Sequence, residues 1–360
     1  MSDTLNLLDL LTLGVQRGAS DLHIHCGRPP LVRIHGEIAP LTDTPLQPID
    51  CQQLIFGVLT EFQAATLQTN WELDFALDVP EIGRFRANAH FAAGCVEAVF
   101  RHIPTSIPEL ESLGHRPIVS DLCKREEGLV LITGYTGAGT TTTAASMIQR
   151  ISQLRSGVII TIENPIEYRY PSALSIIKQR EVGFDTKSFA EGMRQTLRQD
   201  PDVIVVGEMR DHETMQTALT AAETGHLVIG TLHTVDASKT VDRIVDVFPA
   251  DQQNQIVTQL SNNLVAVVSQ RLLPRADGQG RVLATEVMMA NSGIRACIRD
   301  RKPHMILGLI EIGTQDGMHT LDESLSHLVL SGTITYEEAL IHARDPDRIP
   351  KGAKRKGIFG

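Results

Sequence analysis

Four short apolar runs in the second half of the chain carry its strongest structural signal. They span residues 129–133, 158–162, 203–206 and 227–229, and they consist almost wholly of leucine and β-branched residues. Segments long enough for helices separate them. Strands that are apolar at every position are buried on both faces, so this pattern predicts a parallel sheet covered by helices, an α/β fold.

The first hundred residues follow a different pattern, in which apolar and polar positions mostly alternate. Strands in series with a few helices are typical of a smaller α+β domain. We expect a helix over 5–17, strands at 20–27 and 31–36, one or two short helices within 48–67, a strand at 74–80, and a hairpin of strands 83–91 and 96–101.

A segment with three prolines and little periodicity, residues 104–117, separates the two patterns and is predicted to be a linker. It divides the chain into an N-terminal α+β domain, 1–103, and a second domain, 118–360. The last part of the second domain is predicted to be mostly helical, with helices at 252–270, 292–301, 321–330 and 336–342.

Composition excludes several classes of function. The chain has 360 residues, and 42% of them are hydrophobic, enough for the cores of two domains. Its net charge of −10 argues against nucleic-acid binding, and the basic cluster from Lys351 to Lys356 is interpreted as a solvated tail. Five widely spaced cysteines without a C-x-x-C motif favour a reducing cytosol over disulfides or zinc. No signal peptide or membrane-spanning run is recognisable, so we expect a cytoplasmic protein that does not itself span the membrane.

The first apolar run ends in a glycine-rich turn, residues 134–141, followed by a segment compatible with a helix. This is the layout of a phosphate-binding loop, in which backbone N–H groups and the positive end of a helix face the phosphates. In the pattern G-x-x-x-x-G-K-[ST], Thr140 occupies the lysine position. We expect phosphate contacts from Gly134, Thr136, Gly137, Ala138, Gly139, Thr140, Thr141 and Thr142, with the Thr141 hydroxyl at Mg²⁺.

The missing lysine removes a positive charge from the β- and γ-phosphates and from the phosphoryl group in transfer. We expect nucleotide binding to rely on backbone amides, Mg²⁺ and other basic residues, and turnover to suffer more than binding. Glycine-rich turns are common, so the motif alone is ambiguous. A dinucleotide-binding loop is an alternative, which we disfavour because no Tyr-x-x-x-Lys pair follows.

Polar residues follow the other apolar runs as well. Glu163 follows the second run and Glu208 the third, at the strand ends where open α/β sheets bind ligands. Glu163 is suited to orienting or deprotonating water, and Glu208 to holding Mg²⁺ through water; solvation of Glu163 and helix capping by Glu208 near Thr214 are the alternatives. His226 and His233 bracket the fourth run, where they either sense phosphate or make ordinary hydrogen bonds. The four strand ends together predict a nucleotide site.

In this order the motifs resemble one family. The chain is similar to the hexameric secretion-type ATPases of type II secretion and type IV pili, and among them to the twitching-motility retraction ATPases. The resemblance covers nearly the whole chain. It rests on segments 19–23, 29–33, 162–167, 179–183, 188–189, 198–211, 224–234, 290–295 and 317–322.

The resemblance implies a PAS-like N-terminal domain, a RecA-like P-loop ATPase domain, and a six-membered ring that binds ATP and Mg²⁺. The ring is either a homo-hexamer or a hetero-hexamer with a paralogue. The resemblance also implies that Glu163 is the general base, that Glu208 supports Mg²⁺, and that N-terminal arginines approach the phosphates. It places the ring at the inner face of the cytoplasmic membrane, where it drives the pilus platform protein and withdraws pilin. The candidate arginines are Arg84, Arg86 and Arg101.

Two positions depart from the family pattern. Thr140 stands where the family has lysine, and Asn164 stands where it has aspartate. Both changes remove charge from one site. Two functions therefore stay open: a retraction motor with reduced turnover, or a catalytically weak or inactive ring subunit that acts as scaffold or regulator of an intact paralogue. A third interpretation is that Thr140 is a variant of an otherwise active enzyme.

Overall fold

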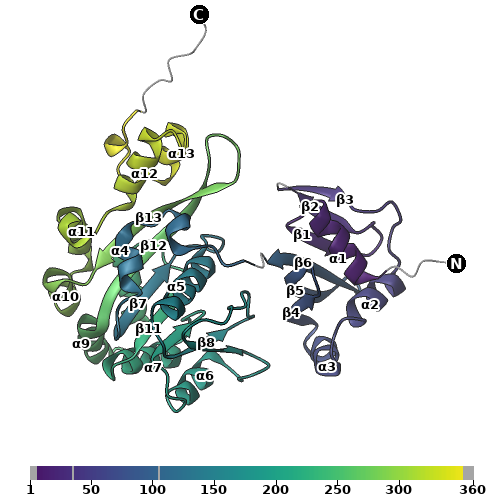
Figure 1. Ribbon diagram of the computed structural model, residues 1–360, viewed down its shortest axis with the longest axis horizontal. Coiled ribbons are helices and arrows are strands. Elements are labelled where there is room, and N and C mark those ends of the chain that lie inside the picture. Colours follow the sequence, from purple (N-terminus) through teal and green to yellow (C-terminus); the bar gives the residue numbers. More distant parts are fainter. Residues whose placement is uncertain (1–5, 35, 104–105, 352–360) are drawn as a thin grey trace, which may run out of the picture. The chain divides into compact units, whose positions relative to one another are not determined.

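The computed structural model of the chain describes residues 6–34, 36–103 and 106–351. Residue 5 of the expected first helix, residue 35 of an expected strand, residues 104 and 105 of the expected linker, and all of the basic C-terminal cluster except Lys351 lie outside this part. The chain divides into two compact units (Figure 1). The first comprises Met1–Ser106 and Pro165–Arg169, and the second Ile107–Asn164 and Tyr170–Gly360.

The first unit contains an antiparallel sheet with the strand order β3-β2-β1-β6-β5-β4. The expected α+β character is confirmed, although β3 was not predicted. Its apolar interior includes Phe75 and Phe100, whose rings meet edge to face with centroids 6.2 Å apart. The elements are α1 (Leu7–Gln16), β1 (Asp21–Ile24), β2 (Leu31–Ile34), β3 (Glu37–Pro40), α2 (Pro48–Phe56), α3 (Glu61–Asn70), β4 (Glu72–Val79), β5 (Gly83–Ala92) and β6 (Cys95–Ile103).

The second unit contains a larger sheet with the order β13-β12-β7-β11-β10-β8-β9, parallel from β12 to β9. The predicted parallel α/β sheet is thus confirmed. Its strands are β7 (Gly128–Thr133), β8 (Val158–Glu163), β9 (Ile176–Glu181), β10 (Val203–Val206), β11 (Leu227–Leu232), β12 (Leu264–Pro274) and β13 (Arg281–Met289).

Helices cover both faces of this sheet, and the expected helices at the C-terminal end are confirmed after residue 290. They are α4 (Pro117–Leu122), α5 (Thr140–Leu154), α6 (Phe189–Thr196), α7 (His212–Glu223), α8 (Ala237–Asp246), α9 (Gln253–Asn263), α10 (Ser292–Arg299), α11 (Ile306–Ile312), α12 (Leu321–Leu330) and α13 (Tyr336–His342). Shorter 3-10 turns span Leu110–Leu113, Pro303–Met305, Thr314–Asp316 and Pro346–Arg348. Every helix in the described part of the chain is too short or too polar to cross a membrane.

The predicted helix over 252–270 is wrong in its second half. Helix α9 ends at Asn263, and β12 begins at Leu264 and pairs in parallel with β7. Residues 264–268 form an apolar run, and periodicity alone does not distinguish a buried strand from a buried helix in so short a stretch. Strand β13 then returns antiparallel to β12, which the sequence analysis also missed.

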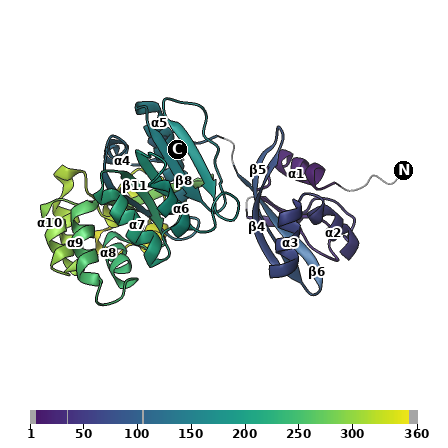
Figure 2. The same ribbon diagram turned by 90° about the horizontal axis from the view of Figure 1, so that it is seen from below.

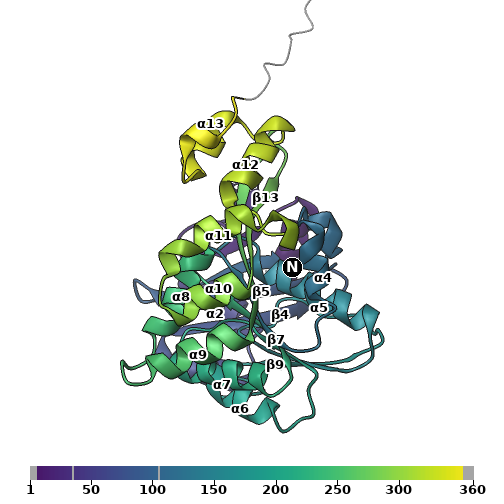
Figure 3. The same ribbon diagram turned by 90° about the vertical axis from the view of Figure 1, so that its left-hand side faces the viewer.

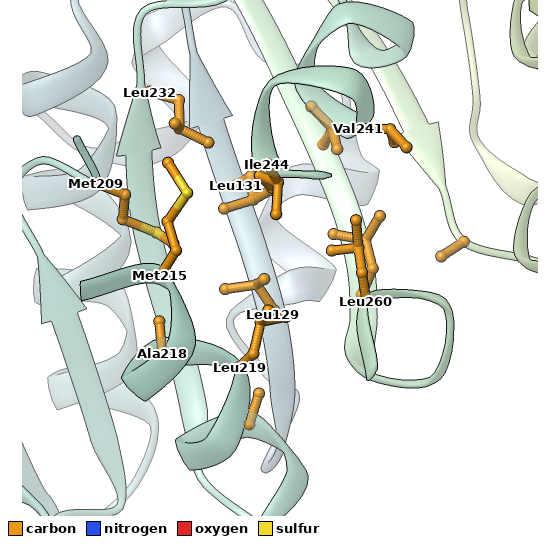
Figure 4. Packing of buried hydrophobic residues seen from close by; sticks show 14 of the residues in the cluster. Leu129, Leu131, Met209, Met215, Ala218, Leu219, Leu232, Val241, Ile244 and Leu260 are labelled. Carbon is orange, nitrogen blue, oxygen red and sulfur yellow. The ribbon is translucent and has the colours of Figure 1, made fainter. Parts of the chain in front are cut away.

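Alternate residues of the central strand β7 enter separate cores on the two faces of the sheet. Leu129 and Leu131 lie in the core formed with α7, α8 and α9 (Figure 4), where Met215, Ala218 and Leu219 of α7 face them. Val130 and Ile132 pack on the opposite face with residues of α4 and α5. Figure 2 shows these two helices on the other side of the sheet from α7, α8 and α9. A smaller core joins α12 and α13 to the hairpin of β12 and β13 (Figure 3).

Candidate active site

The parallel strands bring four polar groups to one edge of the larger sheet. Leu232 at the end of β11 lies opposite Thr133 at the end of β7, and Val206 at the end of β10 lies opposite Ile162 in β8. The glycine-rich loop, Glu163, Glu208 and His233 follow these strand ends. The structure therefore brings together residues that lie up to a hundred positions apart in the sequence.

The glycine-rich loop has the backbone geometry of a phosphate-binding loop. Gly137 and Gly139 have φ values of 84° and 87°, which side chains disfavour. Gly139 caps α5, so the helix begins at Thr140 and its N-terminal N–H groups face the loop. Gly134 is required by packing, because an added Cβ would lie 2.6 Å from the backbone oxygen of Gln270 and 2.7 Å from Cβ of Ala138.

Within this loop the predicted contact residues differ in accessibility. Thr136, Gly137 and Thr141 are exposed, Thr140 and Thr142 are half-buried, and Ala138 is buried. Thr141 is therefore accessible to a ligand, whereas the Ala138 side chain serves packing.

Strand β12 supports the loop from behind. The side-chain amide of Gln270 donates to the carbonyl oxygen of Ala138 at 2.8 Å, and Gln270 is only 2% exposed. The buried hydroxyl of Thr133 donates to that of Ser269 at 2.8 Å. These supports were not predicted, because their segment was expected to be part of a helix over 252–270. A strand assignment would have revealed them, since β12 runs parallel to β7 and extends past its end.

His233 links Glu208 to the loop. Its Nε2 lies 2.8 Å from Glu208 Oε1, and its Nδ1 lies 3.4 Å from the carbonyl oxygen of Gly134. Both partners are acceptors, so a neutral imidazole can donate to only one of them. Arg210 also donates to Glu208, whose side chain is 18% exposed. The carboxylate is thus held beside the loop by two basic groups.

Glu208 does not cap the helix that follows it. The N-cap of α7 is Asp211, whose carboxylate accepts the backbone N–H of Thr214 at 2.8 Å. The capping alternative for Glu208 is therefore wrong, and its carboxylate faces His233 instead.

Glu163 is held at the end of β8 by two neutral donors. The Thr161 hydroxyl and the Gln179 side-chain amide donate to Oε1, the latter at 3.1 Å. Gly207 lies close by, since its N–H donates to Ile162 at 2.8 Å and an added Cβ would approach the Glu163 Cα to 3.3 Å. Asn164, the second departure from the family pattern, is exposed.

His226 is not brought to this edge. It precedes β11, and its Nδ1 lies 3.0 Å from the carbonyl oxygen of Ala221 at the end of α7. The six residues of β11 separate it from His233 by about 20 Å, at the usual rise of an extended strand. Of these two histidines, His233 is the one that contacts the phosphate loop of its own chain.

The three candidate arginines lie in the first unit, where each has a carboxylate partner. Arg84 is buried, donates to Asp78 at 2.6 Å, and also donates to the carbonyl oxygen of Ile166. Arg86 pairs with Glu167 at 3.4 Å. The third, Arg101, donates to Asp21 at 2.8 Å, and its side chain is largely exposed.

The residues at the site fit a magnesium–nucleotide complex better than a metal held by protein alone. The described residues contain no group of three or more His, Cys, Asp or Glu side chains placed to hold a metal ion. Mg²⁺ takes oxygen ligands and usually keeps several waters alongside substrate phosphates and one or two carboxylates. The Thr141 hydroxyl and the Glu208 carboxylate are donors of this kind.

Fold and site together define a P-loop-type ATPase. Residues 76–340 match the family described as Type II/IV secretion system protein, and the chain belongs to this family. It is 42% identical over 343 residues to the type IV pilus retraction ATPase PilT of Pseudomonas aeruginosa, covering 95% of this chain and 99% of that protein. It is also 42% identical over 334 residues to the type IV pilus ATPase PilU of the same organism, covering 93% and 87%.

Solved structures agree with this assignment. The crystal structure of the pilus retraction motor PilT with bound ADP matches with a TM-score of 0.88 and 48% identity, over 95% of this chain and 98% of that chain. The ATPase DotB of Legionella pneumophila matches with a TM-score of 0.78 and 26% identity, over 92% and 94%. The resemblance to the retraction ATPases and the P-loop ATPase class are both confirmed.

Proposed function

We propose that this chain is an ATP-binding ring subunit of the pilus-retraction type, in which ATP hydrolysis is slow. The observation that carries the proposal is the shared sheet edge, where the supported phosphate loop, Glu163 and Glu208 follow the ends of strands in one sheet and His233 links Glu208 to the loop. The similarity to PilT along nearly the full length of both chains supports the retraction role.

Each residue has a proposed task. The backbone N–H groups of the loop and of the first turn of α5 would bind the phosphates, and the Thr141 hydroxyl and Glu208 would hold the Mg²⁺ that accompanies ATP. This ion would neutralise charge on the β- and γ-phosphates. Glu163 accepts the proton of the attacking water. His233 contacts Glu208 through Nε2 and the Gly134 carbonyl oxygen through Nδ1, so a change in the ligands of Glu208 would alter the hydrogen bond between His233 and the loop.

The proposed function also requires several chains to assemble. We propose a PAS-like fold for the first unit and a six-membered ring at the inner face of the cytoplasmic membrane, acting on the pilus platform protein. Arg84, Arg86 and Arg101 would exchange a carboxylate partner for phosphate when nucleotide binds. Pseudomonas aeruginosa holds two relatives of this chain, PilT and PilU, which supports a version with a paralogue in the same ring.

A second candidate function is a scaffold or regulator that binds nucleotide without useful turnover. Thr140 and the exposed Asn164 favour it, because both positions lack a charge that the family pattern carries. The two functions differ in whether purified rings release phosphate.

Titration with fluorescent ADP, followed by steady-state phosphate release from ATP and Mg²⁺, tests the proposal. We expect saturable binding and slow phosphate release, which E163Q lowers by about 10²- to 10⁴-fold while leaving nucleotide binding intact. If E163Q releases phosphate at the native rate, Glu163 is not the general base. The absence of any nucleotide binding would refute both candidate functions. Sedimentation velocity with and without nucleotide tests the ring.

A further inference from the structure

We infer that Arg271 and Arg281, on β12 and β13, supply positive charge to the bound phosphates in place of the missing lysine. This inference rests on the proposed nucleotide function and names two residues of that same site. Neither arginine belongs to the phosphate-loop motif, and both lie more than a hundred positions from it in the sequence.

Arg271 reaches the loop from the support strand. Ser269 lies opposite Thr133 in the parallel pair, so Arg271 extends beyond the end of β7, alongside the start of the loop. Its guanidinium lies over the ring of Tyr135, 5.6 Å from the ring centroid, and that residue is 56% exposed. This cation–π contact holds the guanidinium at the loop surface.

The other contacts of Arg271 leave its charge available. Its Nη1 lies 3.2 Å from Nδ1 of His342 in α13, and the opposite nitrogen of that ring lies 3.1 Å from Glu338. A neutral imidazole satisfies both contacts by accepting from the arginine and donating to the carboxylate. The guanidinium is therefore positioned by a histidine ring, and among the described residues no carboxylate pairs with it directly.

Arg281 reaches the crest of the loop from the neighbouring strand. Its Nη1 donates to the carbonyl oxygen of Gly137 at 3.5 Å, a long contact at an exposed position. The antiparallel pairing of β12 and β13 places Arg281 opposite Pro274, so the two arginines project from one hairpin.

Charge pairing separates these two arginines from others in the same region. Arg275 lies in the turn of the hairpin and pairs with Asp277 at 3.0 Å, and Arg344 pairs with the buried Glu286 at 2.9 Å. Within the described part of the chain, Arg271 and Arg281 form no salt bridge of this kind. Guanidinium groups bind phosphate oxygens strongly, and two uncompensated ones beside a phosphate loop fit a nucleoside di- or triphosphate.

The experiment compares R271Q, R281Q and the double variant with R275Q, a control on the same hairpin whose charge is already paired. Titration calorimetry measures the Kd of ADP. Competition against labelled ADP measures the Kd of adenosine, which carries no phosphate. We expect each of the first two variants to raise the Kd of ADP about ten-fold, as for the loss of one charged hydrogen bond, and to leave adenosine unchanged. R275Q should bind ADP like the native chain, and R271K should recover part of the loss.

Thermal unfolding of each variant separates a folding defect from a binding defect. Combining R271Q with T140K gives a second readout, because a restored lysine should reduce the penalty of R271Q if both groups serve the same phosphates. Native binding of ADP together with unchanged Kd in R271Q and R281Q would overturn the inference and leave the proposed function standing. A native chain that does not bind ADP would overturn both.

Discussion

Restoring the lysine at position 140 is the most direct test of how much chemistry the site has lost. Thr140 is the first residue of α5 and is half-buried, directly after the left-handed Gly139. A longer side chain can leave this position toward the ligand without entering a core. At the first position of a helix a cation is opposed by the helix dipole by only about 0.3–1 kcal/mol, so T140K should fold with nearly the stability of the native chain.

The magnitude follows from charge and distance. An ammonium about 4 Å from a phosphate oxygen interacts by about 4 kcal/mol at an effective dielectric constant of about 20. Position 140 is partly open to solvent, so the lower part of the range for one transition-state donor, about 3 kcal/mol, is the better expectation. At about 1.4 kcal/mol for each factor of ten, kcat should rise about 100-fold.

Steady-state phosphate release at saturating ATP and Mg²⁺ measures this change, with T140M as a control of similar length and no charge. We expect T140M to match the native chain. A gain below about three-fold in T140K, or an equal gain in T140M, would refute the reasoning. Brisk turnover by the native chain would show that Arg271, Arg281 or another basic group already serves the transition state.

Three further predictions concern the second unit. E163Q should lower kcat by about 10²- to 10⁴-fold, as for loss of a general base, with little change in the Kd of ADP by titration. Burial raises the pKa of Glu286, and the neighbouring Arg344 opposes this shift by stabilising the carboxylate. Removing Arg344 leaves a buried carboxyl group without its charged partner, so R344A should lower the free energy of unfolding in urea by about 3 kcal/mol or more, and adding E286Q should recover part of that loss. Equal stability of R344A and the native chain would contradict this prediction. Burial lowers the pKa of His115 and of His319 to about 4, so both stay neutral in the fold while the unfolded chain takes up protons below about pH 6.5. Stability should therefore fall between about pH 6.5 and 4, by about 2 kcal/mol for each histidine at pH 5, and a double glutamine variant with the same pH slope as the native chain would refute this origin.

The sequence predicted the central sheet well because each buried strand carries an uninterrupted apolar run. The runs at β7, β8, β10 and β11 all became neighbouring strands, and their order in the sheet brought the loop and Glu163 to one edge. Both faces of these strands are buried, so every position is apolar, and this pattern can be recognised without knowing which elements pack against the strand.

The missed parts depend on contacts between distant segments. The run at 264–268 matches a buried helix as well as a strand, so β12 and the support from Gln270 could not be foreseen. The misplacement of His226 has a different origin, since a residue before a parallel strand lies at the edge opposite the residue after it and the predicted parallel sheet already implied this. Side-chain pairs such as Arg271 with Tyr135 leave no local signal in the sequence.

The packing of Gly134 and the Gln270–Ala138 hydrogen bond have a consequence for the kinetics of binding. They hold the loop in shape through the chain's own contacts, so its conformational entropy is lost when the protein folds. A nucleotide then meets an ordered loop and has less disorder to remove on association. Stopped-flow binding should therefore show a single concentration-dependent phase, without a slow ordering step. A subunit with poor turnover would in this way still register changes in nucleotide concentration quickly.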